Sequence, residues 1–190
     1  MALRRVPDEH DYEGLVEALR TEFPRLRLVP KHHSLLQRSI HHALRLLTLG
    51  GQSSYLEDYV TTIGARIYLP PGWMTRSPAD RMATLRHERV HLRQFARLGV
   101  LLMGLLYLLV PLPIGFAWFR MRFEREAYEE SIRATWELSG PEAVLDPRYR
   151  AHVVSVFVGP AYGWMWVRRS DVERWYDGVV AGLVESRRLR

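Results

Sequence analysis

The sequence contains no cysteine. This absence excludes a disulfide framework and any metal site with thiolate ligands, so a bound metal would need histidine or carboxylate ligands. Lysine is almost absent too, because 26 of the 27 basic residues are arginines, scattered along the chain. A formal net charge of +6 that is spread in this way is more typical of a solvated surface than of a nucleic-acid footprint. We therefore expect no nucleic-acid partner.

A secretory signal is also missing from the first twelve residues, which are charged and include no apolar stretch. We therefore expect a cytoplasmic location. A chain of 190 residues, of which 47% are hydrophobic, has room for one domain with a sizeable core. We expect a single domain over residues 1–190 with a catalytic core at about 55–140, and the sequence does not indicate the oligomeric state.

The pattern of apolar residues predicts a mainly α fold with a small β element, an α+β class. Residues 59–69 are rich in β-branched and aromatic side chains, which favours a short hairpin or a bent strand. Helical spacing and helix-boundary residues, among them a capping box at Ser170–Glu173, predict helices over 11–23, 31–49, 78–98, 120–138, 149–158 and 170–186.

The predicted helix 78–98 carries the motif His87-Glu88-Arg89-Val90-His91. Histidines at positions i and i+4 share one face of a helix, so both imidazoles can reach one zinc ion at about 2.0–2.1 Å. Glu88, one step round the helix from His87, is better placed to contact a water molecule on the metal than to bind the metal itself. This spacing is typical of zinc hydrolases, in which the glutamate acts as general base.

A second motif, Glu124-Arg125-Glu126-Ala127-Tyr128, follows on the next charged helix. The two motifs together resemble those of gluzincin-type zinc metallopeptidases, in which His-Glu-x-x-His is followed by Glu-x-x-Ala-Asp on another helix. The resemblance covers about residues 59–134 and implies a compact gluzincin-like fold, zinc as cofactor, and a peptide or protein substrate. It also implies that Glu124 is the third zinc ligand, while Tyr128 replaces the aspartate of the family. By their positions on the helix alone, Glu126 is a rival of Glu124 for this role.

Several further residues are weaker candidates for the same site. Tyr128, His152 and Tyr162 are candidates to stabilise the oxyanion that forms during attack on a carbonyl. Gln94, about one turn beyond His91, is a candidate to orient that histidine.

Residues 98–119 contain no charged side chain. This uncharged stretch is long enough to span a bilayer. One crossing would separate Glu124 from the two histidines, and Pro111 and Pro113 interrupt a continuous helix. We therefore favour a buried helix with a proline-containing turn. A peripheral membrane contact stays open as an alternative, and with it the rival hypothesis of a non-enzymatic membrane-docking helical protein, because arginines flank the stretch at Arg97, Arg120 and Arg122.

Overall fold

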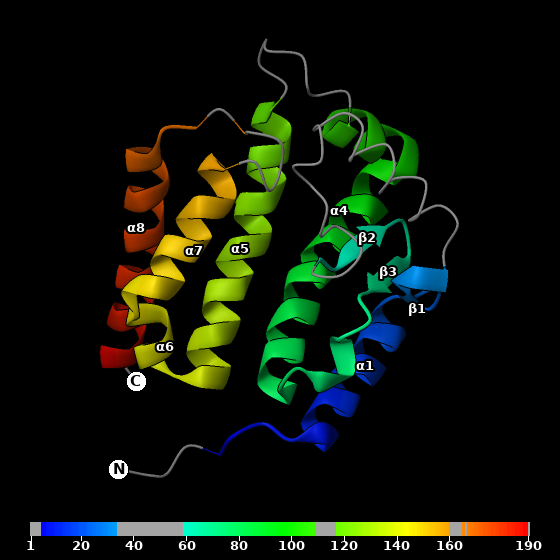
Figure 1. The fold of residues 1–190 in the computed structure, drawn as a ribbon, viewed down its shortest axis with the longest axis horizontal. Coiled ribbons are helices and arrows are strands. Elements are labelled where there is room, and N and C mark those ends of the chain that lie inside the picture. Colours follow the sequence, from blue (N-terminus) through cyan, green and yellow to red (C-terminus); the bar gives the residue numbers. More distant parts are fainter. Residues whose placement is uncertain (1–4, 34–58, 109–116, 160–164, 166, 190) are drawn as a thin grey trace. The chain divides into compact units, whose positions relative to one another are not determined.

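The computed structural model describes residues 5–33, 59–108, 117–159, 165 and 167–189 (Figure 1). By its internal contacts the chain divides into two compact units. One is Pro7–Val100, here called the sheet unit, and the other consists of Leu101–Arg190 with Met1–Val6, here called the helical unit. The expectation of a single metallopeptidase-like domain stays a prediction.

The sheet unit contains a three-stranded sheet with the strand order β1-β3-β2. Strand β1 (Arg27–Pro30) pairs in parallel with β3 (Arg66–Leu69), which pairs antiparallel with β2 (Thr61–Ile63). Gly64, in the tight turn between β2 and β3, has a φ of 60°. That left-handed conformation favours glycine. Of the hairpin or bent strand predicted over residues 59–69, the antiparallel pairing of β2 with β3 shows the hairpin.

Among its described residues, the sheet unit also contains two helices and two 3₁₀ turns, with α1 at Glu9–Glu22, η1 at Lys31–His33, η2 at Trp73–Thr75 and α4 starting at Pro78. Asp8 caps α1, because its side chain accepts a hydrogen bond from the backbone N–H of Asp11. Apolar side chains from α1, the sheet and α4 form one core, namely Tyr12, Val16, Leu19, Leu26, Ile67, Trp73, Leu85 and Leu92. One face of α4 is thereby fixed against the sheet.

Helix α4 runs from Pro78 to Leu108 and contains a break at Gly99, where φ is 75° and ψ is 161°. The helix predicted over 78–98 therefore ends at this break, after which the chain resumes a helix as far as Leu108. Each of the described helices falls short of the length or the apolar character that crossing a bilayer requires.

The described helices of the helical unit are the last turns of α4, from Leu101, and α5 (Ala117–Ser139), α6 (Pro141–Leu145), α7 (Pro147–Val158) and α8 (Arg169–Arg188). Figure 1 shows α5, α7 and α8 side by side. Their apolar faces form a second core around Ile132, Val144, Val153, Val154, Val156, Phe157, Met165, Val172, Tyr176 and Val180. Tyr176, from α8, donates a hydrogen bond to the backbone carbonyl of Val144 at 2.5 Å, which fastens α6 to α8.

The mainly α fold with a small β element is confirmed, and four details differ from the sequence prediction. Strand β1 and the short helix α6 were not predicted. The capping box expected at Ser170–Glu173 is wrong, because α8 starts at Arg169 and its N-cap residue makes no side-chain hydrogen bond. The helix predicted over 31–49 begins as the 3₁₀ turn η1, and its remainder lies outside the described residues.

Candidate metal centre

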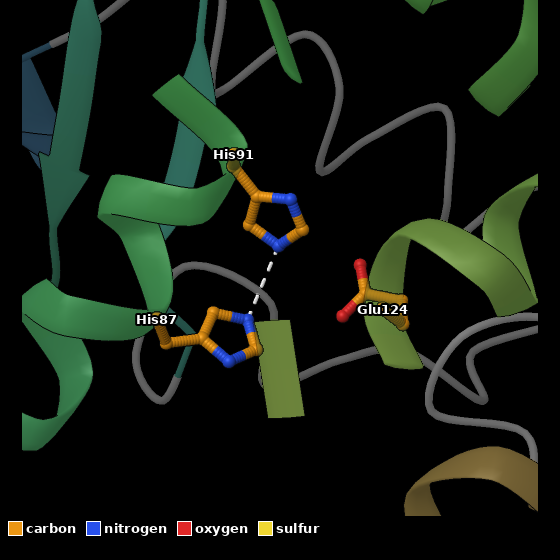
Figure 2. Close-up of side chains that lie close together, drawn as sticks. All are labelled: His87, His91 and Glu124. Atoms are coloured by element: carbon orange, nitrogen blue, oxygen red, sulfur yellow. Dashed lines mark hydrogen bonds between the residues drawn. The ribbon is translucent and has the colours of Figure 1, made fainter. Parts of the chain in front are cut away.

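The two histidines of the motif lie on the middle turns of α4. Ser77 caps the start of this helix, since its hydroxyl accepts a hydrogen bond from the backbone N–H of Asp80 at 3.2 Å. His87 and His91 are each 8% exposed, and their Nε2 atoms are 3.1 Å apart. Figure 2 shows the two rings pointing toward one another from successive turns, joined by this contact. The predicted placement of the two histidines on one helix face is confirmed.

This geometry fits two ligands of one zinc ion. Two nitrogens that each lie about 2.0–2.1 Å from a tetrahedral zinc are about 3.4 Å apart. The observed 3.1 Å between the Nε2 atoms therefore needs only a small rotation of the rings. One face of α4 thus holds two Nε2 atoms at nearly the separation that two zinc ligands need.

Gln94 fixes the orientation of His91. Its side-chain oxygen lies 2.9 Å from His91 Nδ1, and both residues are buried. When Nδ1–H donates to this amide oxygen, the Nε2 lone pair is left for a metal, which is the arrangement that metal-binding histidines ordinarily have. Gln94 therefore has a contact that suits the orienting role considered from the sequence.

Glu88 is held by the sheet. It is 4% exposed, and the Thr62 hydroxyl of β2 donates a hydrogen bond to its Oε2 atom at 2.6 Å. Thr62 is also buried, so this bond forms away from solvent. The carboxylate that follows His87 in the motif is thus fixed by a strand that precedes α4 in sequence by more than a dozen residues.

The single lysine of the chain is the least expected member of this region. Lys31 is 0% exposed, and its Nζ atom donates to the backbone carbonyl of Tyr59 at 3.1 Å and to the Thr61 hydroxyl at 3.0 Å. Burial lowers the pKa of Lys31 to about 7, and the negative charge of Glu88 opposes that shift. A buried ammonium group and a buried carboxylate therefore interact beside the histidine motif.

The proposed third ligand belongs to the helical unit. On α5, Glu124 is 1% exposed and Ala127 is 0% exposed, whereas Glu126 is exposed. Of the two glutamates, Glu124 is therefore the one whose carboxylate is withdrawn from solvent. Figure 2 draws the three side chains predicted to bind the metal, His87 and His91 from α4 and Glu124 from α5.

The candidates for oxyanion stabilisation have different surroundings. Tyr128 packs against Phe157 of α7, with 5.4 Å between the ring centroids, and belongs to the margin of the helical core. His152 is exposed on α7. Tyr162 lies outside the described residues. The roles considered for these three residues stay predictions.

A groove of about 680 Å³ lies between α5 and α8 within the helical unit. It is lined by Arg125, Arg133, Arg174, Trp175 and Gly178 among others. None of the residues predicted to bind zinc or to act in catalysis lines it, so this groove contributes nothing to the metal-site hypothesis.

Comparison of the chain with models of protein families, with curated proteins and with solved structures finds no match. The resemblance to gluzincins therefore rests on the two motifs alone.

Sequence reasoning did not identify Lys31 or Thr62 as neighbours of Glu88. The rarity of lysine in an arginine-rich chain is a signal that could have pointed to Lys31.

Proposed function

We propose that this protein is a zinc-dependent hydrolase, a metallopeptidase that cleaves peptide bonds. The observation that carries the proposal is the buried pair His87 and His91, whose Nε2 atoms lie 3.1 Å apart beside the buried carboxylate of Glu88. Histidines paired at this spacing, with a glutamate next to the first, are typical of one large class of zinc hydrolases. The gluzincin family, the peptide substrate and the cytoplasmic location are parts of the same proposal.

In this proposal His87, His91 and Glu124 hold the metal. The burial of Glu124 supports its choice over the exposed Glu126, because a carboxylate withdrawn from water is stabilised by a positive charge. Its joining the histidine pair is part of the proposal, since Glu124 belongs to the helical unit. Zinc, when bound by such a ligand set, activates a water molecule and polarises a carbonyl group.

Glu88 is the general base. Its carboxylate accepts the proton that the attacking water loses and returns it to the departing amine. For this it must keep one position, and the Thr62 hydroxyl supplies a hydrogen bond that holds Oε2. Below its pKa of about 7, Lys31 adds a positive charge to the surroundings of the same carboxylate. These contacts give Glu88 the pre-organisation that proton transfer demands.

The test is hydrolysis of a mixed peptide library by the zinc-loaded protein, followed by mass spectrometry. Glu88→Gln should keep its zinc and lose activity by about 10²- to 10⁴-fold, because only the proton acceptor is removed. Glu126→Gln is the matched control and should keep both zinc and activity. If Glu88→Gln hydrolyses peptides as fast as the wild type, Glu88 is not the base. If the zinc-loaded wild type cleaves no member of the library, the peptidase proposal is wrong.

A further inference from the structure

The start of the helical unit exposes an apolar surface. Leu101, Leu102 and Leu105 are 90%, 44% and 50% exposed, respectively. Their spacing places them within one face of the last turns of α4, while Met103 on the opposite face is 1% exposed. This segment is therefore amphipathic, with one side in the protein and a leucine-rich side in solvent.

A tryptophan and an arginine extend the same character into the first turns of α5. Trp118 is 48% exposed, and the guanidinium of Arg122 lies over its ring at 5.4 Å from the centroid. An indole paired with an arginine suits the boundary between lipid tails and headgroups, where one part of the pair meets apolar chains and the other meets phosphate. A purely apolar protein partner would offer no phosphate or other anion to the arginine of this pair.

The charged residues nearest in sequence to these exposed apolar side chains have a single sign. Between Arg89 and Phe123 the sequence has 35 residues that include five arginines and no aspartate or glutamate. Of these arginines, Arg89 and Arg93 form ion pairs with Glu22 in the sheet unit. Arg97 and Arg122, which flank the uncharged stretch, are exposed.

We propose that the exposed leucines of α4, namely Leu101, Leu102 and Leu105, and the Trp118–Arg122 pair of α5 dock on an anionic lipid bilayer. The leucines and the tryptophan enter the boundary between headgroups and acyl chains, and the arginines bind lipid phosphates. The described helices are too short or too polar to cross a bilayer, which fits attachment to one leaflet. The proposal does not depend on zinc or on hydrolysis.

Sedimentation of the full-length protein with vesicles tests the proposal. The vesicles are phosphatidylcholine alone or phosphatidylcholine mixed with phosphatidylserine. The wild type should bind the mixed vesicles and release from them as salt is raised. Leu101→Glu should weaken binding about tenfold or more, since it places a carboxylate on the most exposed leucine. Leu145→Glu, at a leucine of α6 that is 57% exposed, is the matched control and should bind as the wild type does.

The arginine contribution is tested separately. Arg122→Gln should lower affinity for the mixed vesicles by about fivefold and leave any binding to phosphatidylcholine unchanged. Arg148→Gln, at an exposed arginine of α7, should change neither. His87→Ala should bind vesicles as the wild type does even if its zinc is lost, which separates this proposal from the hydrolase proposal.

Two results would overturn the docking proposal. One is a wild type that does not sediment with either kind of vesicle. The other is a wild type that self-associates in analytical ultracentrifugation and becomes monomeric on Leu101→Glu, with vesicle binding unchanged by the substitution. The surface would then join two copies of the chain.

Discussion

Lys31 should make the stability of the protein rise with pH. The side chain is 0% exposed, and burial lowers its pKa from 10.5 to about 7, against the opposing charge of Glu88. Below about pH 7 Lys31 is charged in both the folded and the unfolded states, so the cost of burying the charge is present in full. Above pH 7 the folded protein releases the proton while the unfolded chain retains it up to about pH 10.5. Stability therefore increases through this window.

The size of the effect follows from the same pKa values. While the unfolded state holds one proton more than the folded state, the free energy of unfolding rises by about 1.4 kcal/mol per pH unit. Over the whole window, from about 7 to 10.5, the gain is on the order of 5 kcal/mol. That is a large fraction of the 5–15 kcal/mol typical of a folded domain.

The assay is urea unfolding of zinc-free wild type and Lys31→Met at several pH values between about 7 and 9.5. Tyr149 and Tyr176, whose pKa values are raised by burial, destabilise the fold at higher pH. Both proteins share these tyrosines, so their contribution cancels in the difference. The wild type should gain stability relative to Lys31→Met as pH rises. Lys31→Arg, which keeps its charge throughout, should show no such gain over Lys31→Met. Parallel stability curves for the wild type and Lys31→Met would refute the reasoning.

Three further substitutions probe the site and the break in α4. Gln94→Leu should weaken zinc affinity by about 10- to 100-fold in a chelator competition, because His91 loses its hydrogen-bond acceptor. Unchanged affinity would show that this contact is dispensable. Thr62→Val should cost about 1–3 kcal/mol in urea unfolding, since a buried carboxylate loses a donor, whereas Thr62→Ser keeps the hydroxyl and most of the stability. Gly99→Ala should lower the free energy of unfolding by about 1–3 kcal/mol in urea, because φ is 75° at this position. Gly104→Ala, within a regular helical turn, should not lower it. Equal effects of the two substitutions would contradict the backbone argument.

Local sequence signals predicted the parts of the structure that depend on neighbours in the chain. Helix α4 was predicted because Ser77 caps its start and apolar residues repeat at helical spacing. The pairing of His87 and His91 followed from the helix period alone. The hairpin followed from β-branched residues around Gly64.

Contacts between distant residues could not be predicted in this way. Strand β1 has only four residues and pairs with β3 across nearly forty positions, so no local pattern marks it. The hydrogen bond from Thr62 to Glu88 spans 26 residues, and the interaction between Lys31 and Glu88 spans still more. The sequence alone therefore identifies the histidine motif but not the polar side chains that hold its glutamate.

The zinc content of the purified protein tests the central claim most directly. We predict one zinc per chain in the wild type, lost in His87→Ala, in His91→Ala and in Glu124→Gln, and retained in the control Glu126→Gln. Circular dichroism of each variant separates loss of metal from loss of fold. A folded wild type that takes up no zinc, under conditions that load other histidine and carboxylate sites, would contradict the account.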